Sequence, residues 1–294
     1  MDKNTTFLVV GGDFRQNFLA ARLSKFSDRV YTLGLSSDFK CEDCTKLSGF
    51  SDIGFMPDVV VLPLPATSDG KTVNAPFSNE PIYIDRLMNF CKNDSIIVGG
   101  KMPPELCERI KSRKLFCADY FGREELIIEN CVPTAEGALS IAMENTARTI
   151  AGSKVLILGF GRVAKATARV FSALGAKVHV CARKGRDLVY AKTLGYSPVP
   201  IANLCDSLGD FDIVINTVPA VLLGEKELEK VSSDTLIIDL ASKPGGVDFK
   251  SASDRHLKVI WALSLPPKEK DCEKAANAKK INSRTCWGVA VHNT

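Results

Sequence analysis

Three small residues, Gly159, Gly161 and Ala164, have the spacing G-x-G-x-x-A of a turn that binds the pyrophosphate of a dinucleotide. The first glycine permits a tight turn, the second lets the backbone approach the pyrophosphate, and the alanine lets a helix pack closely on a strand. The phosphates would lie on the N–H groups at the start of that helix, where the helix dipole favours negative charge. The predicted cofactor contacts of this turn are Gly159, Phe160, Gly161, Arg162 and Val163.

The elements on both sides of this turn decide whether it is a binding turn or a tight turn without a ligand. The residues before it, 154–158, are apolar apart from Lys154, which predicts a buried strand. A helix is predicted over 165–174 and a second strand over 177–182. This order of strand, turn, helix and strand is the context that the motif requires, so it favours the binding turn.

The end of the second predicted strand indicates which nicotinamide cofactor would bind. An NAD site usually has an Asp or Glu about 20 residues after the first glycine, where it accepts from the ribose 2′-OH. This chain has Arg183, Lys184 and Arg186 there, without a carboxylate. A guanidinium group can stack on adenine and bind a 2′-phosphate through paired hydrogen bonds, and lysine adds a point charge. The sequence therefore predicts NADP, with a solvated basic loop as the alternative.

Two further predicted strands carry polar residues at the cofactor side of the same lobe. The strand 213–215 is followed by Asn-Thr-Val-Pro, and the strand 236–238 by a loop that should border the nicotinamide. Because ligands of open α/β sheets bind beyond the carboxyl ends of the strands, we expect both loops to contact the cofactor. The predicted residues are Asn216, Thr217, Val218, Pro219, Asp239, Ala241 and Ser242, with Lys243 next to them.

The first half of the chain has its own polar strand ends. Gly11 and Gly12 follow a strand over 7–10 and precede Arg15, and this arrangement suits a small anionic substrate. Thr67, Ser68 and Asp69 follow a buried strand over 58–63. We predict that these residues bind the substrate. The structural alternatives are a tight turn in which Arg15 pairs with Asp13, and an ordinary turn over 67–69.

A long helix is predicted to open at residues 131–137 and to connect the two halves. Thr134 is the expected N-cap, and Glu136 lies in the expected first turn, where a carboxylate is favourable. Apolar residues recur at helical spacing from Leu139 to Ile150. We expect the start of this helix to face the substrate.

Composition describes a soluble globular protein and excludes several classes. The 294 residues are 45% hydrophobic and 24% charged, with a net charge of +4. No basic stripe with interleaved aromatics indicates nucleic acid, and no apolar run approaches the roughly 20 residues that span a membrane. The ten cysteines are scattered, and Cys41 and Cys44 lack the further ligands of a zinc site. We expect reduced thiols, no metal and a cytoplasmic location.

The alternation of strands and helices predicts an α/β fold with two doubly wound parallel-sheet lobes, the second a Rossmann NAD(P)-binding domain. The predicted parts are a substrate lobe over 1–132, a connecting helix over 133–151, the Rossmann domain over 152–265 and a charged, poorly ordered tail over 266–294.

The chain resembles the family of the dipicolinate synthase A subunit, found in endospore-forming bacteria, over about residues 5–265. The motifs that carry the resemblance follow one another in the family's order. They are Gly11-Gly12-Asp13-x-Arg15-Gln16, Pro63-Leu64-Pro65-Ala66-Thr67, Pro133-Thr134-x-Glu136-Gly137, Gly159-Phe160-Gly161-Arg162 and Asp239-Leu240-Ala241-Ser242-Lys243-Pro244-Gly245-Gly246. After Pro266 the chain departs from the family's pattern, which indicates a diverged tail or a change of reading frame.

The resemblance implies an NADP-linked oxidation that ends in dipicolinate and starts from the hydroxy-tetrahydrodipicolinate of the lysine pathway. It also implies a partner, the dipicolinate synthase B subunit, with expression in the mother cell of a sporulating bacterium. We assign Arg15 and Lys243 to the two carboxylates of the substrate, and Glu136, or next Asp69, to the proton. Gly11, Gly12, Thr67, Ser68 and Thr134 would help to bind the substrate.

Two other functions stay open at this point. One is a regulatory or scaffold protein that binds NADP(H) without activity of its own. The other is a different two-lobed dehydrogenase of amino or hydroxy acids, and the missing catalytic histidine argues against it. A homo-oligomer is compatible with all three functions.

Overall fold

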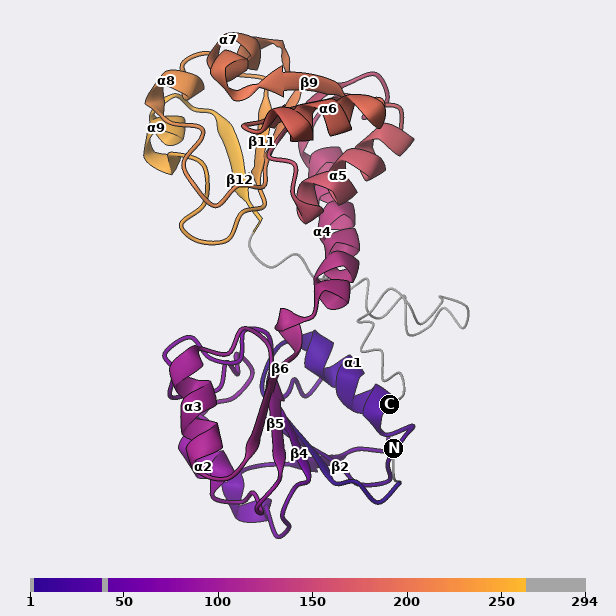
Figure 1. Cartoon of the computed structure of the whole chain (residues 1–294), viewed down its shortest axis with the longest axis vertical. Coiled ribbons are helices and arrows are strands. Elements are labelled where there is room, and N and C mark those ends of the chain that lie inside the picture. Colours follow the sequence, from indigo (N-terminus) through magenta and orange to yellow (C-terminus); the bar gives the residue numbers. More distant parts are fainter. Residues whose placement is uncertain (1–2, 39–41, 263–294) are drawn as a thin grey trace. The chain divides into compact units, whose positions relative to one another are not determined.

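The computed structural model describes residues 3–38 and 42–262, and these form two compact units (Figure 1). Within the described chain, the first unit ends at Ile127 and the second begins at Ile128. Each unit has a six-stranded sheet whose neighbouring strands all pair in parallel. The fold is therefore the predicted α/β type with two doubly wound parallel sheets.

The sheet of the first unit has the strand order β3-β2-β1-β4-β5-β6, which reverses between β1 and β4. Helix α1 follows β1, α2 precedes β5, and α3 connects β5 to β6. The strands are β1 (Phe7–Val10), β2 (Val30–Leu33), β3 (Thr45–Leu47), β4 (Val59–Val61), β5 (Ile96–Gly99) and β6 (Phe116–Asp119), and the helices are α1 (Phe14–Leu23), α2 (Ile84–Met88) and α3 (Pro104–Ser112), with short 3-10 turns at Phe50–Asp52 and Tyr120–Gly122.

The second unit repeats this order as β12-β11-β10-β7-β8-β9, with the reversal between β7 and β10. This is the order 3-2-1-4-5-6 of Rossmann domains. The strands are β7 (Lys154–Leu158), β8 (Lys177–Ala182), β9 (Ser197–Pro200), β10 (Ile213–Asn216), β11 (Leu236–Asp239) and β12 (Lys258–Trp261), and the helices are α5 (Arg162–Ala173), α6 (Gly185–Thr193), α7 (Leu204–Ser207), α8 (Glu225–Leu228) and α9 (Phe249–Asp254), with 3-10 turns at Ile201–Asn203 and Leu208–Asp210.

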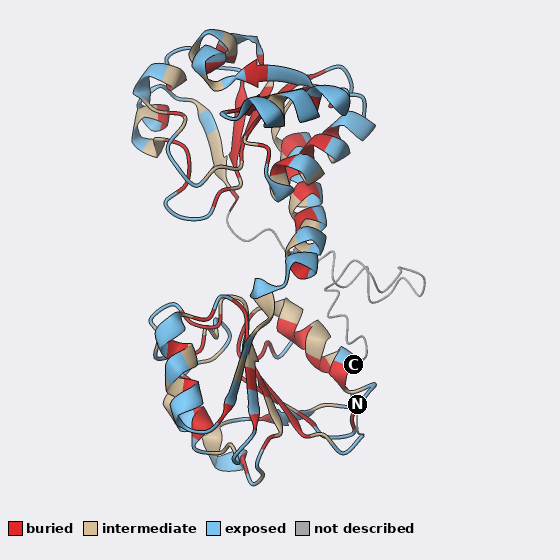
Figure 2. Ribbon diagram, viewed as in Figure 1, coloured by how far each residue is buried: buried red, intermediate tan, exposed pale blue. Residues whose placement is uncertain are grey.

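Both sheets are buried on both faces, which explains why their central strands are continuous apolar runs (Figure 2). Along β7, Val155 and Ile157 belong to one core cluster, whereas Leu156 and Leu158 belong to the other. This alternation is that of a strand whose successive side chains point to opposite faces. The first unit divides its core in the same way along β1.

Helix α4 (Glu124–Asn145) begins ten residues before the predicted N-cap, Thr134. Pro133 lies inside this helix, and the Thr134 hydroxyl donates to the Asn130 carbonyl at 2.9 Å, one turn earlier. The predicted cap at Thr134 is therefore wrong. Pro133 suggested a helix start at this point because proline is also common at the first position of a helix.

The sequence over 78–89 has a helical pattern, but α2 covers only Ile84–Met88. The residues before it pair with an extended segment instead. Val73 N donates to the Ile82 carbonyl at 2.9 Å, and Ile84 N donates to the Lys71 carbonyl at 3.0 Å. Tertiary hydrogen bonds thus override the local helical pattern here.

Three further sequence expectations concern the cysteines, a membrane span and the tail. Cys44 is disulfide-bonded, so the expectation of reduced thiols is wrong for this residue, whereas Cys91, Cys107, Cys117, Cys131, Cys181 and Cys205 are free. No helix of the described residues is long and apolar enough to cross a membrane. The predictions for the tail over 266–294 lie outside the described residues.

Candidate functional site

Gly159 makes the turn at the carboxyl end of β7, and no other residue fits there. Its φ of +94° lies in the left-handed region, and its N–H donates to the Cys181 carbonyl at 2.8 Å. A Cβ at this position would lie 2.8 Å from the Thr217 Oγ1 and from the Val218 Cγ2. Both the backbone conformation and the close approach of the β10 loop therefore require glycine.

Gly161 is the N-cap of α5, and its surroundings suit a bound phosphate. A Cβ there would meet no atom within 4 Å, so the backbone is open to close approach. No side chain caps the helix at this residue. Three residues later, Ala164 is fully buried against the sheet, as the motif predicts. The turn thus has the shape and the helix start that a pyrophosphate requires.

Thr217 joins the ends of β7 and β10, the two strands between which the sheet order reverses. Both its N–H and its hydroxyl donate to the Leu158 carbonyl, at 3.1 and 2.7 Å. Thr217 and Val218 are half-buried and Pro219 is exposed. The loop therefore lies at the crevice where open α/β sheets bind their ligands.

Asn216 and Asp239, two predicted cofactor contacts, are fully buried and hold these loops together. The Asn216 Nδ2 donates to the Asp239 Oδ1 at 2.7 Å and to the Val218 carbonyl at 2.9 Å. The Asp239 carboxylate also accepts from the N–H groups of Ala241 and Gly246, at 3.0 and 2.8 Å. The polar side-chain atoms of Asn216 and Asp239 are thus already paired inside the protein, which gives them a structural role, and their contact with the cofactor stays a prediction.

The loop after β11 presents fewer residues than predicted. Ala241 is 3% exposed, and its carbonyl accepts from the Trp261 Nε1 at 3.1 Å. A Cβ on Gly246 would overlap the Asn216 amide, so this backbone packs directly on the Asn216–Asp239 pair. Ser242 and Lys243 are exposed. These two residues, rather than Ala241, remain available to a ligand.

Phe160, inside the glycine turn, packs in the core of the second unit. It is 7% exposed, and its ring contacts the rings of Tyr190 and Tyr196 edge to face. The Lys165 Nζ lies 5.3 Å from the same ring centroid. Phe160 therefore packs the turn against Tyr190 of α6 and against Tyr196, the residue before β9, and its contact with the cofactor stays a prediction.

The basic residues after β8 are presented to solvent. Arg183 and Lys184 are exposed, and Lys184 is the N-cap of α6. Arg186 pairs loosely with Asp187, at 3.6 Å. The charged donors thus stand at the strand end where a dinucleotide's adenosine ribose is expected, which fits a 2′-phosphate.

In the first unit, Gly11 and Gly12 connect the end of β1 to α1 with φ values of +63° and +86°. Their N–H groups, which we expected to bind substrate, donate instead to the carbonyls of Leu33 and Asn74, at 2.9 and 2.7 Å. The two glycines can therefore support a ligand by their shape but not through these donors.

Arg15 lies in the first turn of α1 and is held in place from two sides. Its Nε donates to the Asp13 carboxylate at 2.7 Å, and one terminal nitrogen donates to the Leu64 carbonyl at 2.9 Å. Asp13 is also the N-cap that accepts from the Arg15 N–H. The pairing that we considered as the structural alternative is thus present, and it fixes the guanidinium group at the carboxyl end of β4.

Tyr120 follows β6 at the same edge of the sheet. Its hydroxyl donates to the Leu62 carbonyl at 3.2 Å. Burial raises the pKa of Tyr120, and the nearby positive charge of Arg15 partly offsets this increase. Tyr120 therefore stays protonated and neutral beside Arg15.

Thr67 and Asp69 organise their own loop. The Asp69 carboxylate accepts from the N–H groups of Lys71 and Thr72 at 2.8 and 2.7 Å, and from the hydroxyls of Thr72 and Thr67 at 2.8 and 3.0 Å. These hydrogen bonds, above all those from Thr72 and Lys71, lower the pKa of Asp69. Asp69 is therefore a poor proton acceptor, and Thr67 has its hydroxyl proton committed. Ser68 is exposed, and substrate binding by Thr67 and Ser68 stays a prediction.

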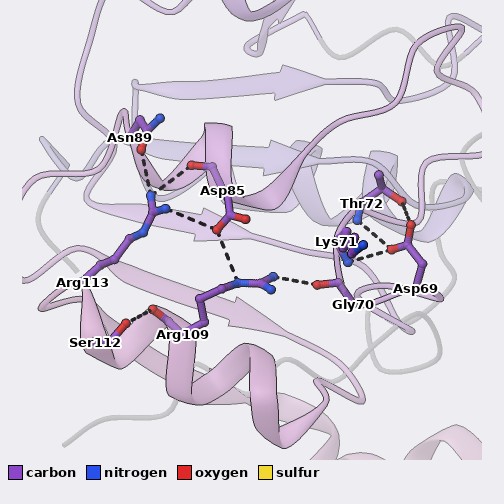
Figure 3. Close-up of polar contacts among 9 residues, drawn as sticks. All are labelled: Asp69, Gly70, Lys71, Thr72, Asp85, Asn89, Arg109, Ser112 and Arg113. Carbon is purple, nitrogen blue, oxygen red and sulfur yellow. Dashed lines mark hydrogen bonds and ion pairs between the residues drawn. The ribbon is translucent and has the colours of Figure 1, made fainter.

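Arg109 of α3 attaches this loop to the rest of the unit, next to Arg113, the C-cap of the same helix (Figure 3). Arg109 donates to the Gly70 carbonyl at 2.6 Å and lies 3.4 Å from the Asp85 carboxylate. Arg113 donates to Asn89 and also pairs with Asp85, at 2.8 and 3.4 Å. Arg109 is thus the residue that links α3 to the loop over 67–72.

Glu136 and Thr134 lie in the interior of α4 and belong to the second unit, as does Lys243. Glu136 is exposed. It does not lie in a first helical turn, so the argument from the helix start no longer supports its role. The predicted substrate residues are divided between the units, since Arg15 and Ser68 belong to the first.

Two residues at the edge of the first sheet, Gln16 and Tyr120, have no role among those predicted from the sequence. Gln16 is 5% exposed, and its Nε2 has no hydrogen-bond partner. Tyr120 contacts the end of β4 although 58 residues separate it from Leu62. The position of Gln16 directly after Arg15, in the first turn of a helix that follows a sheet strand, was a usable signal. No local signal pointed to Tyr120.

Comparisons with known proteins agree with this architecture. Residues 6–121 match the family model of the N-terminal domain of the dipicolinate synthase A subunit, and residues 134–244 match the NAD binding domain of D-isomer specific 2-hydroxyacid dehydrogenases. The dipicolinate synthase A subunit of Bacillus subtilis (strain 168) is 34% identical over 265 residues, which are 88% of each chain.

Two solved structures with the same name resemble most of this chain. The crystal structure of the dipicolinate synthase A subunit from Bacillus halodurans has a TM-score of 0.78 at 33% identity and covers 89% of this chain and 90% of its own. The A chain of dipicolinate synthase from Bacillus subtilis also has a TM-score of 0.78 at 33% identity, with 90% of both chains covered.

Proposed function

This chain belongs to the family of the dipicolinate synthase A subunit, and from that premise we propose that it is an NADP-dependent oxidoreductase that forms dipicolinate. The precursor is hydroxy-tetrahydrodipicolinate, which loses water to give a dihydropyridine dicarboxylate. Removal of a hydride and a proton from that ring then gives the aromatic product. Aromatisation supplies the driving force.

The observation that carries the choice of cofactor is the set of exposed cations at the end of β8. Arg183 and Lys184 stand where an NAD site has a carboxylate, and the turn at Gly159 and Gly161 provides the pyrophosphate site. When bound, the nicotinamide is the hydride acceptor. The remaining part of the proposed cofactor site is lined by Thr217, Val218, Pro219 and Ser242, with Arg162 and Val163 at the start of α5.

Arg15 is the proposed ligand of one substrate carboxylate. Asp13 and the Leu64 carbonyl fix the plane of its guanidinium group, so little side-chain freedom is lost when a carboxylate binds. Lys243 is the proposed partner of the second carboxylate, and Ser68 and Thr134 are proposed as further hydrogen-bond partners. These two cations suit a doubly acidic substrate.

Glu136 remains the proposed proton acceptor. Among the described residues, its exposed carboxylate takes part in no hydrogen-bond network of the kind that holds Asp69. A general base must reach the ring proton of the bound substrate, and this requirement is geometric before it concerns the pKa.

The proposed biological setting follows from the family. The protein would act with the dipicolinate synthase B subunit, in the mother cell of a sporulating bacterium, on a precursor that branches from the lysine pathway.

The test is a product assay with the purified full chain, the precursor and NADP⁺, in the presence and in the absence of the B subunit. We expect ultraviolet absorbance of the pyridine product to rise together with the absorbance of NADPH, in equal amounts. If product forms only when the B subunit is present, this chain catalyses part of the reaction and the B subunit is needed to complete it. Binding of NADPH without any product under either condition would contradict the oxidoreductase and favour an NADP(H)-binding scaffold.

A further inference from the structure

Gln16 has a buried amide donor that nothing inside the described part of the protein uses. The side chain is 5% exposed, and its Nε2 is buried without a hydrogen-bond partner. Leaving such a donor unpaired is costly, and native proteins leave few of them unsatisfied. A buried donor that the fold itself does not use indicates a ligand.

Three buried side-chain polar atoms lack a hydrogen bond in the described part of the chain, and Gln16 differs from the other two. The Arg109 Nε still lies 3.4 Å from the Asp85 carboxylate, so it has a charged partner. Asn17 lacks a partner only for its Oδ1, because its Nδ2 donates to the Ser36 carbonyl at 3.2 Å. Among these three, Gln16 is therefore the case of an amide donor with neither a hydrogen bond nor an ion pair.

The side chain of Gln16 packs beside Gly12, which follows β1, and close to Pro63, which follows β4. Its Cγ occupies the space beside Gly12 so closely that a Cβ on the glycine would overlap it, and the same Cβ would lie 2.8 Å from the Pro63 Cβ. The strand order of the first unit reverses between β1 and β4. In open α/β sheets this is the crevice that binds ligands.

The preceding helix residue, Arg15, supplies the charge at this crevice. Its guanidinium group is bonded to Asp13 and to the carbonyl of Leu64, three residues after the end of β4. A cation and a neutral donor, adjacent in the first turn of one helix, suit an anionic group with several acceptor lone pairs, which is a carboxylate.

We propose that Gln16 is a specificity-determining residue that donates from Nε2 to the substrate carboxylate paired with Arg15. This inference rests on the proposed function, because it takes a pyridine dicarboxylate as the ligand. The neutral amide contributes a directed hydrogen bond without adding charge, and it favours a group that only accepts.

The test uses titration calorimetry of the full chain with dipicolinate, together with thermal unfolding. In Gln16→Met the donor is lost at similar side-chain length. We expect its affinity for dipicolinate to fall by about tenfold or more, the effect of losing a hydrogen bond to a charged group. The midpoint of unfolding should not fall, because an unsatisfied buried donor is removed.

Gln16→Glu adds a second readout. Near neutral pH its carboxylate repels the ligand, so we expect weaker binding than in Gln16→Met. Part of the affinity should return as the pH falls toward about 5, close to the ordinary Glu pKa of about 4.3, where a protonated carboxyl group can donate. Asn17→Leu, which alters the neighbouring buried amide whose donor is already used, is the matched control and should bind dipicolinate like the wild type.

The results distinguish a failure of the role proposed for Gln16 from a failure of the proposed function. Wild-type affinity in both Gln16 variants would overturn the role of Gln16 and leave the function standing. If the wild type binds NADPH but no dipicolinate, the substrate class is wrong and the role of Gln16 falls with it. Should Gln16→Met fail to fold, the pH response of Gln16→Glu decides, and a flat response overturns the proposal.

Discussion

Carboxylates at the ends of strands have structural tasks in both units of this protein. Asp239 joins the loops after β10 and β11, and Asp69 closes the loop after β4. Each accepts hydrogen bonds from backbone N–H groups of its own loop. At the scale of single residues, the position of a polar side chain at the carboxyl edge therefore does not make it a ligand contact. Whether such a side chain can contact a ligand depends on the donors and acceptors that its own loop leaves unused.

Asp69 leads to a prediction about the pH dependence of stability. Hydrogen bonds lower its pKa in the folded protein below the value of about 3.9 expected for the unfolded chain. Folding therefore favours the charged form. Its contribution to stability is fully present above that unfolded value and is lost as the pH falls through the lowered pKa of the folded state.

We expect Asp69→Asn to lower the free energy of unfolding near neutral pH and to make the loss of stability under strongly acidic conditions smaller than in the wild type. Urea unfolding of both proteins at about pH 7 and about pH 3 measures this. The pH profile of product formation around neutrality should stay the same. If the decrease in the rate of product formation at low pH disappeared in the variant, Asp69 would be the proton acceptor after all.

At the scale of elements, the sequence predicted most central strands because both faces of each sheet are buried. Strands such as β1, β7 and β10 appear as short apolar runs followed by glycine or polar residues. The edge strands β3 and β9 were not predicted, since they are short and largely exposed. They belong to the sheets because they pair with β2 and β8, and the residue pattern within a single strand does not predict such pairing.

The site was less predictable than the fold. The glycine turn at 159–164 was found because its spacing follows from backbone geometry. The sequence did not predict which polar side chains form hydrogen bonds within the protein. The side chains of Asn216, Asp239 and Thr67 all do so. Hydrogen bonds within the folded loops and between residues far apart in the chain decide these cases.

The link between α3 and the loop over 67–72 gives a prediction at the same scale. In Arg109→Gln the hydrogen bond to the Gly70 carbonyl is lost, and we expect the free energy of unfolding to fall by about 1–2 kcal/mol. Because this loop borders the proposed substrate site, KM for the precursor should rise while NADPH affinity is unchanged.

Arg113→Gln is the matched control for that variant. It removes contacts with Asp85 and Asn89 but none with the loop (Figure 3). Urea unfolding and steady-state kinetics of the two variants make the comparison. An equal rise in KM in both would show that general loosening of the unit, rather than loss of the loop contact, changes substrate binding.

At the scale of the whole molecule, two units with the same strand order differ in the turn that follows the first strand of each sheet. In the second unit, the turn after the first strand leaves space beside Gly161 for a phosphate. In the first unit, the N–H groups of Gly11 and Gly12 are used by backbone carbonyls, and side chains of α1 supply the donors instead. Equal topology therefore allows one unit to bind a dinucleotide and the other a small acid.

The most direct test of the account is the cofactor preference of the purified full chain, measured by fluorescence titration with NADPH and NADH. We expect the wild type to bind NADPH more tightly. We expect the double variant Arg183→Ala, Lys184→Ala to lose about tenfold or more of NADPH affinity without change toward NADH, because only the 2′-phosphate contacts are removed. Binding of NADH in preference to NADPH by the wild type, or equal losses for both cofactors in the variant, would contradict the account.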